Sequence, residues 1–307
     1  AYQEGQDDAA EDEDANRLPA MAADLEAEAG SDAKALQDKA FRDALGYAVD
    51  RKTLVERVLG GYGDPGTTNV PPVLADWHVE PDNPRTFDIE LAKQKLDAAG
   101  YKLDANGNRL DKENKPITLR MYFPNTNDSY PKAAQFIKEW YLLLGIKVTT
   151  GSLDSAALGT LILPPEGDGT AKYDIELWGW SGNPDPNALL QIFRCDAIGG
   201  TSDSQYCNPE FDKLYDDQLK QAGAERHATL VKIQNLIYDE APYDILYYDS
   251  NLDVYRTDAF AGWVNQPADG TPLLTYGTIN YTQLTDAKAV PTPAPSVSPA
   301  PGAASSA

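Results

Sequence analysis

The chain has 307 residues, with 48 acidic and 26 basic side chains and a formal net charge of −22. This length exceeds that of a usual single domain and supplies enough apolar sequence for one large or two smaller cores. The negative charge argues against nucleic acid and anionic membrane surfaces as partners, because both would repel the chain.

The first residues are polar and acidic. Residues 1–32 hold eleven acidic side chains, and Arg17 is their one basic residue. Such a composition buries too little apolar surface to offset the entropy cost of ordering, so we expect residues 1–34 to be disordered. The printed sequence contains no run of 18 apolar residues and no basic-then-apolar leader.

Helical periodicity predicts two successive helices between Asp38 and Leu59, the second capped by Asp50. Glycines and prolines predict a loop over residues 62–84. A helix over residues 88–99 follows, ended by Gly100.

The polar turn over residues 104–115 alternates Asp and Asn in the manner of a calcium loop. Such a loop needs glycine at its sixth position and glutamate at its twelfth, whereas Gly107 is fourth and Lys115 is twelfth. The turn therefore predicts a hairpin, and we expect no metal site here.

Strand, helix and strand patterns follow over residues 117–123, 130–144 and 146–149. Two strands joined through a helix form a parallel pair, so the fold class is α/β with a mainly parallel, mixed sheet flanked by helices. A helix over residues 154–163 continues the alternation. Ligands of such sheets bind beyond the carboxyl ends of the strands, which are here the loops after Phe123 and Trp180.

The stretch from Tyr173 to Phe193 organises the chain. It begins with an alternating pattern typical of a strand of about six to eight residues, with Glu176, Trp178 and Trp180 on one side. A proline and glycine cluster ends that strand, and Asn187 is expected to cap a short helix. Such a strand end is typical of the rim of a ligand cleft, although two tryptophans can also simply cover the edge of a core.

Cys195 and Cys207 are the only cysteines. Zinc would need further ligands at matching spacing, so the pair favours a disulfide, with buried free thiols as the alternative. Closing this loop contributes about 3 kcal/mol in the chain-entropy model, and a disulfide indicates an oxidising, extracytoplasmic compartment.

Two amphipathic helices over residues 208–221 and 225–241 and two strands over residues 243–248 and 252–256 complete the pattern, followed by a strand-like stretch over residues 262–284. The proline-rich end favours extended chain. No GxSxG elbow, phosphate-binding GxxxxGK loop or HExxH helix is present, so we expect neither an enzyme nor a cofactor.

Several motifs together resemble the family 5 solute-binding proteins of ABC importers, the dipeptide- and oligopeptide-binding type. They include FRDALGYAVDRKTLVERVLGGYG, LGIKV, YDIELWGWSGNPDPNALL and CNPEFDKLYDDQL, in an order and spacing that make the combination specific. The resemblance implies a lobe of the type II periplasmic-binding-protein fold over residues 35–260, a return segment over 261–285 and a tail over 286–307. Most of the family's first lobe has no counterpart here, so we expect a fragment or a truncated or split gene product.

Dipeptide-type members hold the ligand carboxylate with an arginine after the first strand and its ammonium with an aspartate after the tryptophan strand. In this chain the first position falls at Asn127 and the second near Gly182 and Asn183, with Asp185 as the nearest carboxylate. Neither anchor matches, so longer peptides, or sugars stacked on tryptophan, remain open as ligands. The expected ligand-binding residues are Asn127, Tyr130, Trp178, Trp180, Asn183 and Asp185.

The resemblance also implies function. It indicates a monomeric substrate-binding component of an ABC importer that binds peptides or a related small solute outside the membrane and delivers it to permease subunits, with no anchor in this chain. A cysteine pair after the tryptophan strand occurs in dipeptide-type members and supports the disulfide. The alternatives are a sensory or scaffold module that keeps this lobe without transport, and a peptide hydrolase.

Overall fold

The computed structural model describes residues 33–162, 173–182, 184–252, 254, 256, 258–265 and 285–286. The chain divides into two compact units, Ala1–Asp249 and Ser250–Ala307. Most of the acidic segment 1–34, Asn183, and most of the segments 261–285 and 286–307 lie outside the described residues. In the described part, no helix is both long enough and apolar enough to span a membrane.

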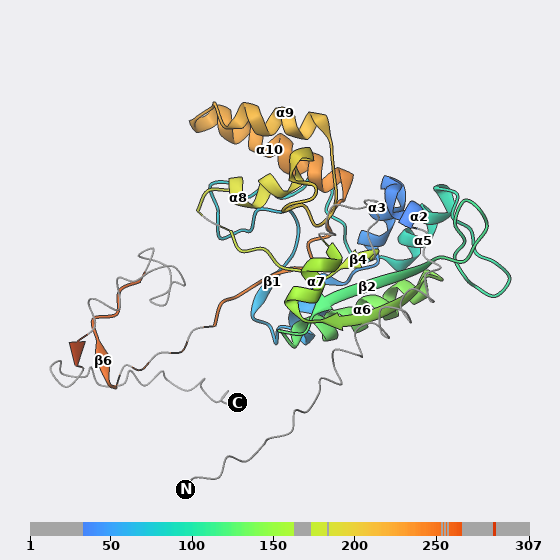
Figure 1. Ribbon diagram of the computed structural model, residues 1–307, viewed down its shortest axis with the longest axis horizontal. Helices are drawn as coiled ribbons and strands as arrows, with labels where there is room; N and C mark the ends of the chain where they lie inside the picture. Colours follow the sequence, from blue (N-terminus) through green and yellow to red (C-terminus); the bar gives the residue numbers. More distant parts are fainter. Residues whose placement is uncertain are drawn as a thin grey trace, which may run out of the picture. The chain divides into compact units, whose positions relative to one another are not determined.

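The first unit alternates helices and strands, as the sequence predicts (Figure 1). Its helices are α2 (Ala33–Gln37), α3 (Lys39–Tyr47), α4 (Arg51–Arg57), α5 (Ile89–Ala98), α6 (Ser129–Leu143), α7 (Ser155–Ile162), α8 (Asn187–Leu190), α9 (Pro209–Gln218) and α10 (Gly223–Glu240), with 3-10 turns at Gln191–Phe193 and Cys195–Ala197. Its strands are β1 (Gly63–Pro65), β2 (Thr118–Pro124), β3 (Lys147–Leu153), β4 (Ile175–Glu176) and β5 (Tyr247–Asp249). In the second unit, β6 (Phe260–Ala261) pairs antiparallel with β7 (Thr285–Asp286).

The central sheet has the order β3-β2-β4, and both pairings are parallel. This confirms the predicted α/β class. β4 is shorter than the predicted strand: after the Leu177 amide donates to the Tyr122 carbonyl, the ladder stops. The next residue of β2 on that side is Pro124, which has no amide hydrogen to donate.

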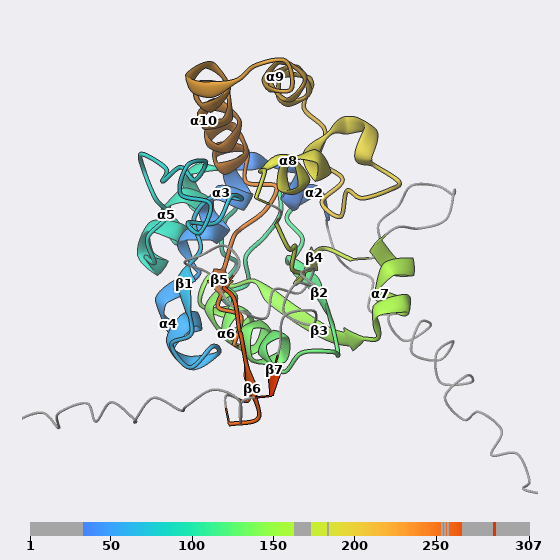
Figure 2. The ribbon, with the colours of Figure 1, turned by 90° about the vertical axis from the view of Figure 1, so that its left-hand side faces the viewer.

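The main core lies between this sheet and the helices α3, α5 and α6. Leu119, Met121 and Phe123 of β2 belong to it, together with buried residues of α6 such as Ile137. Tyr122 points to the other side of the sheet, where it packs with Leu158 and Ile162 of α7 and with Tyr173. Figure 2 shows α6 and α7 in separate positions beside the strands. The sheet is therefore covered by helices on both faces.

The helix ends follow the predicted caps. Asp50 accepts a hydrogen bond from the Thr53 amide (3.1 Å) at the start of α4, and Gly100 ends α5 with a positive φ of 94°. The loop expected over residues 62–84 contains the short strand β1, which pairs antiparallel with β5. The sequence did not predict β1, because a strand of three residues is too short to show an alternating pattern. Leu252, Val254 and Arg256 lie in no strand, unlike the prediction for residues 252–256.

A second core joins α8, α9 and α10. The helices α9 and α10 lie side by side in both views (Figures 1 and 2). Phe193 is fully buried and meets the rings of Phe211 and Tyr243 edge-on, at centroid distances of 5.9 and 4.7 Å. The loop between α8 and α9 is closed by a disulfide between Cys195 and Cys207, which confirms the predicted pair. The disulfide therefore ties the two ends of the loop over residues 195–207 to each other.

Candidate functional site

The parallel strands β2 and β4 end at the same edge of the sheet, and the segments that follow them form the candidate site. After β2, the exposed Asn127 accepts a hydrogen bond from the Ser129 amide (2.8 Å) and so fixes the first turn of α6. After the last ladder bond, at Leu177, residues 178–182 run on without ladder bonds. This arrangement brings the two predicted ligand loops to one edge.

The two tryptophans stand at the surface of this edge. Trp178 is 42% exposed and Trp180 is 44% exposed. Gly179, between them, lies close to Tyr130: a Cβ atom built on Gly179 would be 3.2 Å from the Tyr130 hydroxyl. Tyr130 follows the loop of Asn127 in the chain. The rings are therefore not packed inside the protein, and their segment lies against the start of α6.

Trp180 is held by the disulfide-closed loop. Its indole Nε1 donates to Oδ2 of Asp203 (2.9 Å). The Tyr173 hydroxyl donates to the backbone carbonyl of the same aspartate. Asp203 is only 9% exposed, and burial raises the pKa of its carboxyl, which the bond from Trp180 partly opposes. The loop between Cys195 and Cys207 thus places an acidic group directly behind the tryptophan.

Glu176 is a second acidic group at this position. It is the last residue of β4 and is half-buried, and its Oε1 atom is shut off from water without a hydrogen-bond partner. Burial, and then the charge of Asp203, raise the pKa of Glu176 to about 8. At neutral pH the Glu176 carboxyl is therefore mostly protonated.

Further polar atoms around Asp203 lack partners. Ser202 is fully buried, and neither its hydroxyl nor that of Ser204 makes a hydrogen bond. The Oδ1 atom of Asp203 is also buried and unpartnered. Buried polar groups in folded proteins are normally satisfied, so this gathering is unusual.

Tyr130 completes the near side of the site. Its ring packs against the main core while its hydroxyl faces the Gly179 backbone. Burial, followed by the neighbouring Tyr247, Asp249 and Glu176, raises the pKa of Tyr130 to about 12. The phenol therefore stays protonated at all physiological pH values and is able to donate a hydrogen bond.

Asp185 has a different environment. Its two carboxylate oxygens accept from the guanidinium of Arg226 on α10, at 2.8 and 2.9 Å. This hydrogen bonding lowers the pKa of Asp185. Asp185, rather than the predicted Asn187, also accepts from the first amide of α8 (2.9 Å), while Asn187 accepts from Gln218 (2.7 Å). The carboxylate of Asp185 is already used to fix the turn.

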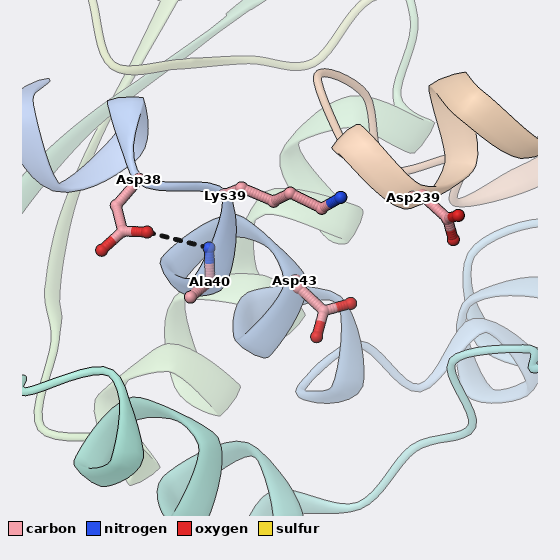
Figure 3. Close-up of a pocket in the computed structure, with 5 residues that line it drawn as sticks. All are labelled: Asp38, Lys39, Ala40, Asp43 and Asp239. Atoms are coloured by element: carbon pink, nitrogen blue, oxygen red, sulfur yellow. Dashed lines mark hydrogen bonds between the residues drawn. The ribbon is translucent and has the colours of Figure 1, made fainter.

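A separate hollow lies between α3 and α10 and is lined by Asp38, Lys39, Ala40, Asp43 and Asp239 (Figure 3). Two of its acidic groups, Asp38 and Asp43, serve the fold. Asp38 accepts from the Ala40 amide (3.0 Å) at the start of α3, as Figure 3 shows, and Asp43 is bound by Arg85 and Lys95 at 2.9 and 2.8 Å. We therefore place the candidate site at the tryptophans and not in this hollow.

Comparison with known proteins shows the family of the chain. The sequence model of the bacterial extracellular solute-binding proteins, family 5 (middle), matches residues 5–200, which include β2, β4 and both tryptophans. The chain belongs to this family. The match also includes most of the acidic residues before Ala33.

Two curated relatives and one solved structure show the range of the likeness. The oligopeptide-binding protein OppA of Bacillus subtilis is 29% identical over 71% of this chain and 38% of its own length. Heme-binding protein A of Haemophilus influenzae is 32% identical over 66% of this chain and 35% of its own. The structure of the oligopeptide-binding protein AppA from Bacillus subtilis, in complex with a nonapeptide, matches with a TM-score of 0.62 and 30% identity over 69% of this chain and 42% of that one.

The chain thus spans about two fifths of the length of the relatives that it matches. These relatives are named as binding proteins and not as enzymes. Their fold confirms the type II periplasmic-binding-protein architecture expected from the sequence.

Two residues of the site were missed by sequence reasoning. Glu176 lies on the same side of the strand as Trp178 and Trp180, and that alternation was a usable signal. Asp203 had none, because only the disulfide-closed loop brings it back to Trp180. The roles predicted for Asn127, Tyr130, Trp178, Trp180 and Asp185 remain predictions, and Asn183 lies outside the described residues.

Proposed function

We propose that this chain supplies the solute-contacting surface of the substrate-binding component of an ABC importer, and that it takes up peptides or a related small solute. One observation supports this above all. Trp178 and Trp180 remain 42% and 44% exposed at the carboxyl edge of a parallel sheet, beside the loop of Asn127 and Tyr130. Membership of the solute-binding family adds the class of ligand.

In this proposal the predicted site residues have separate tasks. The two tryptophans contact the solute, and Asn127 and Tyr130 border it from the start of α6. Asn183, which lies outside the described residues, is expected from the sequence to lie in the turn that follows the tryptophans. Asp185 keeps that turn in shape through Arg226 (2.8 Å). The protein acts as a monomer outside the membrane and hands its solute to permease subunits. The disulfide between Cys195 and Cys207 supports an oxidising compartment.

Calorimetric titration of the 307-residue chain with short peptides tests the proposal. We expect binding of at least one peptide, and a loss of about tenfold in affinity for Trp178→Ala, since aromatic side chains dominate binding surfaces. Tyr62→Ala is the matched control, because Tyr62 is an aromatic residue that is 58% exposed elsewhere on the first unit. Absence of binding by all peptides, or equal losses for the two variants, contradicts the proposal.

A further inference from the structure

Two acidic side chains, Glu176 and Asp203, interact electrostatically without a cation paired to either of them in the described residues. Asp203 is bonded to the Trp180 indole at 2.9 Å, and the charge of Asp203 acts on Glu176. Within residues 173–182 and 184–249, no lysine, arginine or histidine forms an ion pair with either carboxyl group. Asp43 and Asp185, by contrast, are paired with arginine or lysine.

The unpartnered atoms around this pair are all acceptors or able to accept. They are Oε1 of Glu176, Oδ1 of Asp203 and the hydroxyl oxygens of Ser202 and Ser204. Asp203 is nine-tenths buried and Ser202 is fully buried. An ammonium group brings three N–H donors and no acceptor, and a guanidinium group brings five. These free acceptor atoms therefore match the N–H donors of an organic cation.

The position is also open to a solute. Glu176 keeps part of its surface in water, and the Trp180 ring, which is bonded to Asp203, is 44% exposed. Cations bind well against the face of an indole ring. A divalent metal ion fits less well, because the described residues contain no group of three side chains of the kind that ligate metals.

We propose that Glu176, Asp203 and Trp180 form a subsite for an ammonium or guanidinium group of the bound solute. This inference rests on the proposed solute-binding function and adds a preference for positively charged solutes. The carboxyl pair neutralises the cation, Trp180 flanks it, and the disulfide between Cys195 and Cys207 keeps Asp203 in place.

Binding at this subsite releases a proton. Glu176, with its pKa raised to about 8, is mostly protonated at pH 7, and a cation favours the ionised form. The titratable groups that act on it or lie beside it are Asp203 from the loop, Tyr173 before β4 and Tyr130 from α6, and burial raises the pKa of all three. Affinity for a cationic solute is therefore expected to rise between pH 6 and pH 8, by less than tenfold per pH unit.

The source of the cation is either the peptide's amino terminus or a basic side chain. Four probes separate them: Ala-Ala-Lys-Ala-Ala and its norleucine analogue, each with a free or an acetylated amino terminus. In calorimetry on the 307-residue chain at pH 7, we expect removal of the recognised cation to weaken binding at least tenfold. Removal of the other cation changes affinity less than twofold.

Glu176→Gln is expected to abolish this discrimination, so that the four peptides bind within twofold of one another. Glu56→Gln is the control, since Glu56 is an exposed carboxylate on α4 that pairs with Lys52 at 4.0 Å. Repeating the titration in phosphate and in Tris measures proton release, which we expect for the wild type and not for Glu176→Gln. This second measurement does not depend on small differences in stability.

The outcomes separate the two proposals. Equal affinity of the wild type for all four peptides, or unchanged discrimination in Glu176→Gln, overturns the cation subsite and leaves peptide binding intact. Failure of every peptide to bind overturns the proposed function and the subsite with it.

Discussion

Two acidic places in the first unit differ in what surrounds their carboxyl groups. In the hollow between α3 and α10, Asp43 is bound by Arg85 and Lys95 at 2.9 and 2.8 Å. Asp203 lies behind Trp180, its charge acts on Glu176, and neither carboxyl group has a basic partner in the described part of the chain. Burial disfavours the charge of Asp43, but its two hydrogen bonds outweigh burial and lower its pKa. For Glu176 nothing opposes burial, and the pKa rises.

The difference teaches how to separate structural acidic groups from candidate binding groups in a chain of net charge −22. A carboxylate with its cation already supplied holds elements together, as Asp43 joins α3 to the chain around Arg85. A carboxyl left without a cation costs stability, because a buried charge is poorly solvated. Such a cost is characteristic of functional sites. The depth of a hollow is a weaker guide than the pairing of the charges within it.

Removing a basic partner of Asp43 should have the largest effect on stability. Arg85 is almost fully buried, donates to Asp43 and to the Tyr238 carbonyl (2.6 Å), and lies 4.1 Å from the Tyr238 ring. Arg85→Met leaves two acceptors without this donor, and we expect the free energy of unfolding to fall by about 3–4 kcal/mol. Urea denaturation measures it. Lys93→Met, which removes an exposed helical pair with Glu90, should cost less than about 1 kcal/mol.

Removing the disulfide tests whether the loop between Cys195 and Cys207 positions Asp203. Replacing Cys195 and Cys207 by serine opens a loop with a sequence separation of 12, which should lower the free energy of unfolding by about 3 kcal/mol. Because Asp203 lies in this loop, affinity for the cationic peptide should fall as well. Unchanged peptide affinity in a variant of clearly lower stability would show that the loop does not position Asp203.

Glu176→Gln should act in the opposite direction. The folded state holds a proton on Glu176 up to a pH of about 8, whereas the unfolded chain releases it near the ordinary value of 4.5. Wild-type stability therefore falls as pH rises through this window. Since Glu176 remains partly in water, we expect the variant to be more stable by only about 1–2 kcal/mol at pH 8.5, far less than the full shift would give.

At pH 4 the Glu176→Gln variant and the wild type should have the same stability, because the carboxyl is then protonated in both states. Thermal unfolding across the pH range checks this. A variant whose stability runs parallel to that of the wild type at every pH would remove the distinction between the two acidic places.

The smallest effect is expected at Asp185. Asp185→Asn keeps the shape of the side chain but weakens its bond to Arg226, and the half-exposed pair should lose no more than about 1 kcal/mol. The preference for cationic peptides should stay within twofold of the wild type. A larger loss of that preference, with stability unchanged, would place Asp185 among the groups that contact the solute.

Local signals in the sequence were sufficient for most of the fold. Capping aspartates such as Asp50, glycine at Gly100 and the strand–helix–strand pattern up to β3 predicted elements that the structure contains. These features depend on neighbours along the chain. Two features were not predicted from the sequence. β1 depends on pairing with residues 247–249, and β4 ends early because a proline on β2 has no amide hydrogen to donate.

The candidate site was predictable only in part, for the same reason. Trp178 and Trp180 are visible from alternation and from the breaker cluster that follows. The partner of Trp180 is Asp203, 23 residues along the chain, and no periodicity links the two. Likewise, Asp185 reads as a free carboxylate until α10 brings Arg226 beside it. Charge pairing is a tertiary property, and so is the difference between a structural and an unpaired acidic residue.

The bond from Trp180 to Asp203 has an optical consequence. An indole whose N–H points at a carboxyl group emits differently when that group gains or loses charge, and here the carboxyl is coupled to Glu176. The emission of Trp180 should therefore follow the ionisation behind it without any attached dye. The intrinsic fluorescence of Trp180 would therefore report on events at the candidate binding site.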